Sequence, residues 1–163
     1  MELPINPIAI PVAAVAALFI GALWYNPKIG FGNIWMQESG MTEEKMKTGK
    51  MGVIFGLSLV FAALLASLLM SYTNHQWGAF SLVGGDPELA KPSFEAFMND
   101  YGTAFRTFKH GALHGSMFGL FGALPIIGTI ALFERKSAKY IFVNSGYWIV
   151  TLAVMGAIIC GWV

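Results

Sequence analysis

Charged residues are scarce in this sequence. Only 12% of its 163 residues are Asp, Glu, Lys or Arg, whereas 56% are hydrophobic. A soluble domain carries about a quarter charged residues, so the composition excludes an ordinary soluble fold and indicates lipid as the solvent. The net charge of +1 provides no basic surface for nucleic acid. The single cysteine, Cys160, excludes a disulfide within the chain.

Processing and catalytic signals are also lacking. The first ten residues contain no Lys or Arg, unlike the basic start of a cleavable signal peptide, so we expect the first apolar run to be retained as a membrane span. The sequence has no G-x-S-x-G, no H-E-x-x-H and no phosphate-binding glycine loop. No charged residue stands inside the long apolar stretches, where ion-coupled carriers usually have one. We therefore expect neither an enzyme nor a coupled transporter.

Four long uncharged stretches remain. They predict spans at about 7–26, 51–73, 110–133 and 140–162, within one transmembrane domain over residues 1–163. Aromatic residues recur on one helical face between the second and third spans. This pattern predicts an extracytoplasmic amphipathic helix at about 93–108, although the same aromatics would equally cap the top of a bundle. The expected fold is an all-α, integral membrane four-helix bundle.

Basic residues are divided unevenly between the two sides of such a bundle. Seven of the ten lie in segments 26–50 and 134–139, and three lie between the second and third spans. The positive-inside rule places the richer side in the cytoplasm and both termini outside it. We expect a multi-pass protein of the cytoplasmic membrane, the inner membrane of a bacterium.

Small residues recur at four-residue spacing on three of the predicted spans. Such stripes let helix backbones approach closely. Packing within one chain and an oligomer interface are both open interpretations. The residues are Ala13, Ala17 and Gly21 on the first span, Gly52 and Gly56 on the second, and Gly111, Gly115, Gly119 and Gly122 on the third.

The topology brings the histidines to one membrane edge. His75 follows the second span, and His110 and His114 open the third, one helical turn apart. Imidazoles at positions i and i+4 can bind one metal ion from a single helical face. Cys160 near the end of the fourth span would add a thiolate suited to zinc or copper, with Asp100 as a candidate oxygen ligand. Interfacial histidines also hydrogen-bond to headgroups, water or carbonyl groups, which is the competing interpretation.

Two stretches of the chain carry a family resemblance. One is Gly21-Ala22-Leu23-Trp24-Tyr25-Asn26-Pro27, continuing through Phe31 and Gly32 to Trp35; the other is Leu132-Phe133-Glu134-Arg135, continuing to Gly146-Tyr147-Trp148. With the four-span layout, the chain resembles the small membrane proteins of domain-of-unknown-function family 1761. That resemblance implies a four-helix membrane protein and no established activity, so it carries over no catalytic residue.

The sequence thus predicts a non-catalytic multi-pass protein whose partners are the lipid bilayer and either further copies of itself or other membrane proteins. No cofactor is required, apart from zinc or copper if the histidines bind metal. A small channel or exporter and an extracytoplasmic metal-binding protein are the alternatives. The channel alternative rests on polar residues expected in the cytoplasmic half, namely Ser58, Thr129, Asn144, Ser145, Tyr147 and Thr151.

Overall fold

The computed structural model describes residues 5–84 and 86–163, and over these residues it contains helices and no strand. The all-α prediction is therefore confirmed for this part of the chain. Three helical segments are long and apolar enough to cross a membrane. They are α4 (Met51–Thr73), the segment Phe108–Phe133 that joins α7 (Phe108–Phe118) to α8 (Leu124–Phe133), and α9 (Ala138–Gly161).

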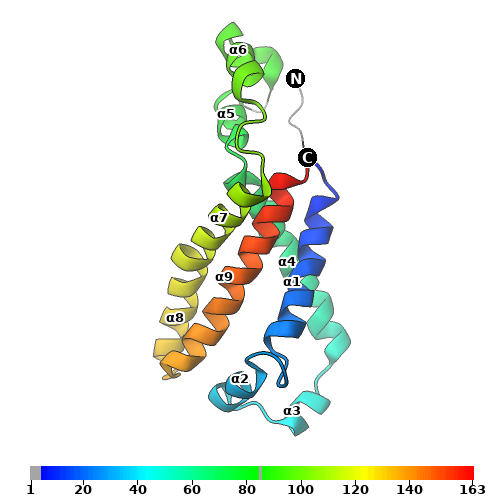
Figure 1. Ribbon diagram of the computed structural model, residues 1–163, viewed down its shortest axis with the longest axis vertical. Helices are drawn as coiled ribbons and strands as arrows, with labels where there is room; N and C mark the ends of the chain where they lie inside the picture. The colour runs from blue at the N-terminus through cyan, green and yellow to red at the C-terminus, as the bar shows by residue number, and fades with distance from the viewer. Residues whose placement is uncertain (1–4, 85) are drawn as a thin grey trace.

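The first predicted span is shorter than expected. Helix α1 (Ala9–Trp24) has 16 residues, which at 1.5 Å per residue gives about 24 Å, below the roughly 30 Å of a hydrocarbon core. It nevertheless runs beside α4 and α9 (Figure 1). The structure thus supplies three candidate spanning helices and a fourth, shorter apolar one.

Alanine makes close packing possible where α1 and α4 meet α9. Ala13 and Ala17 on α1 are 0% and 2% exposed, as the stripe on the first span predicts. Gly21 continues that face against the Tyr147 ring, whose hydroxyl would lie 3.4 Å from a Cβ there. The larger core side chains that fill the remaining space are Leu69, Met70, Leu152, Met155 and Ile159.

The glycine stripe of α7 packs against α9 of the same chain. A methyl group at Gly111 would overlap the carbonyl oxygen of Gly156, and one at Gly115 would overlap that of Leu152. At Gly119 it would lie 2.6 Å from the Ile149 Cα atom, closer than real contacts allow. These glycines permit backbone-to-backbone contact between two of the candidate spanning segments.

Gly122 does not share that contact. Residues Gly119–Ala123 form a π-helical turn, and a Cβ at Gly122 would meet only the ring of Phe118, at 3.7 Å. Pro125 explains the turn, because it has no N–H to donate to the carbonyl four residues earlier. The wider turn rotates the following residues away from the line that regular spacing predicts.

Gly52 and Gly56 likewise lie apart from the packed faces. Nothing stands within 4 Å of a Cβ built at either position. The buried residues of α4 all fall in its second half, from Ala62 to Thr73, because the first half diverges from α1 and α9. The predicted packing of these two glycines is not made within the described chain.

Short helices lie at both ends of the bundle (Figure 1). At one end are α2 (Gly32–Ser39) and α3 (Glu43–Lys47); at the other are α5 (Gln76–Leu82), the 3₁₀ turn η1 (Pro87–Leu89) and α6 (Pro92–Tyr101). Helix α6 ends earlier than the predicted amphipathic helix at 93–108, because the chain turns at Gly102 and Thr107 caps α7 by accepting a hydrogen bond from the His110 N–H.

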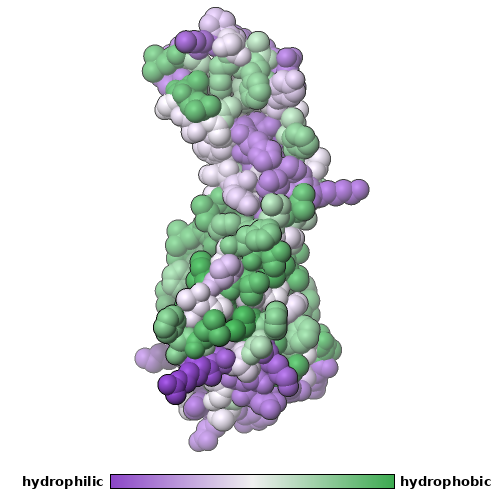
Figure 2. All heavy atoms as spheres, turned by 90° about the vertical axis from the view of Figure 1, so that its left-hand side faces the viewer, coloured by the Kyte–Doolittle hydropathy of each residue, from purple (hydrophilic) through white to green (hydrophobic). Residues whose placement is uncertain are grey.

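One face of the molecule carries a broad band of hydrophobic side chains. Figure 2 shows hydrophobic side chains over the α7–α8 side, between hydrophilic surfaces at the lower end and at the neck above α7. An exposed apolar surface of this extent suits contact with lipid rather than water. Its exposed side chains include Leu113, Met117, Leu120, Phe121, Ile126 and Ile130.

Candidate metal centre

Three histidines converge at the neck where α4 ends and α7 begins. His75 is the N-cap residue of α5, two residues after the end of α4, and His110 and His114 occupy successive turns of α7. Each offers a ring nitrogen, and these nitrogens all lie within 4.8 Å of one another. The ring centroids are 4.9 Å apart for His75 and His110, and 5.0 Å for His75 and His114. Two helices separated by a long connection thus contribute to one cluster.

The spacing suits a first-row transition metal. Tetrahedral zinc with bonds of 2.0–2.1 Å to nitrogen places its ligand nitrogens about 3.3 Å apart. The Nε2 atoms of His110 and His75 are 3.0 Å apart, so small side-chain rotations would bring the set to a coordinating geometry. Three imidazoles leave a fourth position for water or another ligand.

Without metal, the same nitrogens form a hydrogen bond. At 3.0 Å, one Nε2 of the His75–His110 pair carries a proton and donates it to the other. A metal ion would replace that shared proton and use both lone pairs. Aromatic contacts also hold the histidine rings. The ring centroids of Phe105 and His110 are 5.1 Å apart, and Tyr72 meets His114 edge-on with centroids 5.7 Å apart. A purely structural cluster is the competing interpretation.

The turn before α7 contacts the histidines through Phe105, whose backbone is strained. Phe105 has a φ of 63°, which an aromatic side chain rarely adopts, and such strain persists only when surrounding contacts hold it. Arg106 supplies one contact by donating from Nε to the Cys160 carbonyl, 3.1 Å away in the last turn of α9. Burial lowers the pKa of Arg106 below its ordinary value, yet a guanidinium remains charged at neutral pH and complements the negative end of the helix.

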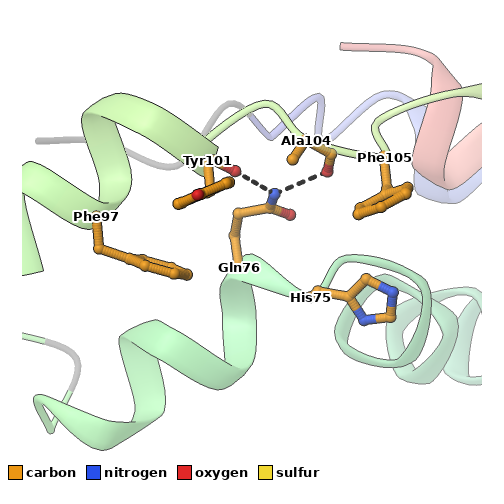
Figure 3. A pocket seen from close by; sticks show the side chains of 6 residues that line it. All are labelled: His75, Gln76, Phe97, Tyr101, Ala104 and Phe105. Carbon is orange, nitrogen blue, oxygen red and sulfur yellow. Dashed lines mark hydrogen bonds between the residues drawn. The ribbon is translucent and has the colours of Figure 1, made fainter.

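Gln76 supplies the other contact. Its Nε2 donates to the carbonyls of Tyr101 and Ala104, each at 2.9 Å (Figure 3). The residue is 4% exposed, so these two bonds are protected from water. Gln76 therefore ties the end of α6 to the residue after His75 and fixes the turn that carries Phe105.

A cavity of about 200 Å³ adjoins the cluster. In Figure 3, Gln76 lies between the rings of Phe97 and Tyr101 on the left and those of Phe105 and His75 on the right. The lining residues are His75, Gln76, Phe97, Tyr101, Ala104 and Phe105. Its position beside His75 gives the histidine cluster an open side.

Cys160 and Asp100 do not join the histidines. The Cys160 Sγ faces the carbonyl oxygens of Phe105 and Thr73, at 3.5 and 3.6 Å, and the residue is 0% exposed. The depth of Cys160 along α9 was predicted from the sequence, but its side chain turns into the helix contact beside Gly111. Asp100 is exposed on α6 and lies outside the metal-ligating group that the described residues form.

The two motif stretches meet at the other end of the bundle. The Trp24 indole donates to the Val143 carbonyl at 3.0 Å, and the Tyr25 hydroxyl donates to Asn144 Oδ1 at 3.0 Å. The Tyr147 hydroxyl donates to the Ala17 carbonyl at 3.1 Å. These bonds fasten the end of α1 to α9, so the contacts of the motif are structural.

Tight turns complete this motif. Gly32 packs against the backbone at Pro27. A Cβ built at Gly32 would lie 2.7 Å from the proline nitrogen, closer than real contacts allow. Trp24 stacks on Phe31 with ring centroids 4.7 Å apart, and Tyr25 packs on Trp35 at 5.5 Å. Gly146 makes room for the Trp24 ring, 2.9 Å from its would-be Cβ. Glu134 and Arg135 stand in the exposed turn after α8, where Arg135 adopts a left-handed φ of 56° that ends the helix.

Comparison with known proteins gives one finding. The family model described as "Protein of unknown function (DUF1761)" matches residues 8–160. No curated protein and no solved structure matches the chain. The family resemblance drawn from the Trp24 and Glu134 stretches is therefore confirmed.

Proposed function

The chain belongs to the DUF1761 family of proteins of unknown function, and from this premise we propose that it is a non-catalytic multi-pass membrane protein that binds one transition-metal ion at the membrane edge. The observation that carries the proposal is the cluster of His75, His110 and His114, whose ring nitrogens lie within 4.8 Å of one another. Imidazole suits zinc, copper, iron and nickel. A site of three neutral nitrogens without a thiolate favours zinc or copper(II) among these.

The binding role can be tested directly. The protein, purified in detergent without chelators, is expected to take up one zinc or copper(II) ion per chain in calorimetry and to retain it through gel filtration. At a free-metal concentration of 100 times the dissociation constant, binding would stabilise the fold by about 2.7 kcal/mol. Absence of uptake would reject the proposal.

A binding role is favoured over the channel alternative by the burial of two polar residues. Of the six polar residues expected in the cytoplasmic half, Ser145 and Thr151 are 1% and 0% exposed. Asn144, Tyr147 and Ser58 are half-buried, and Thr129 is exposed. Side chains that line an aqueous path retain contact with water. Polar side chains buried between membrane helices more often serve helix packing.

An oligomer or accessory-subunit role receives separate support from the open face of α4. Gly52→Leu with Gly56→Leu is expected to reduce self-association or co-purification of a partner, because leucines would block close helix approach there. Monomer stability should change little, since nothing within 4 Å opposes the new side chains. Light scattering in detergent and thermal unfolding measure the two effects, with Leu57→Phe, at a 51% exposed position of the same helix, as control. An unchanged assembly would exclude this face.

The proposal also includes a topology. Helix α1 crosses the inner membrane as a fourth, short span, α6 lies outside the cytoplasm, and both termini are extracytoplasmic. The basic residues near α2 and α3 support this topology.

In a Cys160→Ala background, Leu89→Cys is expected to react with an impermeant thiol reagent on intact cells. Thr48→Cys should react only after lysis, and the reverse pattern would invert the orientation. Both positions are exposed.

A further inference from the structure

A second, larger cavity lies at the end of the bundle opposite the histidines. It measures about 630 Å³ and is bounded by α2, α3 and the first turn of α4. Pockets that bind small molecules usually measure about 300–1,000 Å³. Helix α3 has no buried residue and so leaves this space open beside the bundle.

Methionines dominate the apolar wall of this cavity. Met36, Met41, Met46 and Met51 all contribute to it, four of the nine methionines in the chain. The flexible, polarizable thioether adapts to irregular apolar partners. An alkyl chain is such a partner.

The cavity adjoins exposed apolar side chains at the start of α4. Met51 and Ile54 line it, and they are 45% and 49% exposed on that helix. Val53 and Phe55 beside them are 56% and 53% exposed. An acyl chain lying along the start of α4 would therefore reach the cavity without leaving an apolar surface.

Charges of both signs stand on the remaining wall. Lys45 and Lys47 provide two ammonium groups, and Glu43 provides one carboxylate. The Lys45 Nζ also donates to the Gly40 carbonyl at 3.3 Å, which holds this lysine across the loop before α3. A ligand that matches all three groups carries a negative and a positive charge close together.

We propose that this cavity binds a zwitterionic phospholipid with a primary ammonium group, such as phosphatidylethanolamine. Its phosphate pairs with Lys45 and Lys47, its ammonium donates to Glu43, and an acyl chain packs on the methionines and along α4. The exposed apolar start of α4 beside the cavity, the methionine wall and the mixed charge point to this occupant. The site is independent of the proposed metal centre.

Native mass spectrometry of the full-length protein in detergent, with equal amounts of phosphatidylethanolamine and phosphatidylglycerol, tests this. One phosphatidylethanolamine should be retained in preference. Glu43→Gln should lower that preference about threefold, and Lys47→Gln should weaken both lipids about threefold, the size expected of one exposed charge contact. Lys139→Gln, which removes an exposed lysine elsewhere on the same side, should change neither.

Two further experiments distinguish binding of the headgroup alone from binding of the whole lipid. Glycerophosphoethanolamine, which has no acyl chains, should not compete at the same concentration. Met46→Trp, at a 37% exposed position, should fill the cavity and reduce retention of both lipids. Equal retention of the two lipids by the unaltered chain, or a preference unchanged in Glu43→Gln, would overturn the proposal.

Discussion

Replacing His110 and His114 together by alanine is expected to abolish metal retention, from about one ion per chain to background. In the proposed site, the two rings supply two of the three ligand nitrogens. Loss of a partner that merely supports a ligand costs about 10–100-fold in affinity, so loss of two ligands should exceed that range. Elemental analysis after gel filtration and calorimetry with zinc and copper(II) measure the effect. The rise in unfolding temperature on adding metal should disappear with it.

Two single variants distinguish a residue that binds the metal from one that supports the site. His75→Ala should weaken binding severely, although it lies outside α7. Gln76→Met keeps an unbranched side chain of similar length but removes both hydrogen bonds to the 101–104 carbonyls, so it should weaken binding by about 10-fold through the loosened Phe105 turn.

Cys160→Ala is the matched control. It removes a soft ligand type near the same membrane edge, yet its sulfur faces backbone carbonyls rather than the histidines. Binding should persist in this variant. Loss of metal in Cys160→Ala but not in the histidine variants would contradict the site and restore the thiolate as a ligand.

The spacing of the histidines in the sequence predicts their cluster, but not the side-chain contacts that hold the cluster in place. His110 and His114 are one turn apart, and the predicted topology brings His75 to the same edge. Which way Cys160 points depends on the rotation of α9 about its axis, which is set by contacts with Gly111 and Thr73. Gln76 gave no signal, because one glutamine after a helix resembles any solvent-exposed turn residue.

For the helices, too, the sequence predicts local features but not the contacts that depend on how the helices are placed. Stripes at regular spacing identified the contact faces of α1 and α7, since a 3.6-residue period is a local property. Gly122 does not lie on the contact face because the π turn at Gly119–Ala123 breaks the helical period. In the sequence, Pro125 was the feature that could have indicated this turn. Gly52 and Gly56 matched the pattern equally well, but whether a face meets a neighbour depends on helix divergence, which no spacing encodes.

Gly115→Leu is expected to destabilise the protein severely, by about 3 kcal/mol or more. Overpacking a well-filled site costs about 1–3 kcal/mol, and here the obstruction is backbone, which cannot change rotamer. A Cβ at Gly115 would already overlap the Leu152 carbonyl and lie 3.0 Å from the Ala153 Cα. The branched end of leucine would have to push α7 and α9 apart. Thermal unfolding in detergent measures the loss.

Leu113→Phe provides the control, two residues away on the same helix. Leu113 is 57% exposed and faces the lipid side, where a larger ring meets fluid chains rather than a packed helix. Its unfolding temperature should stay close to that of the unaltered protein. Equal stability of the two variants would mean that α7 and α9 do not touch along this stripe. Because Gly111 belongs to the same contact and precedes His114 by three residues, Gly115→Leu should also weaken metal binding, whereas Leu113→Phe should not.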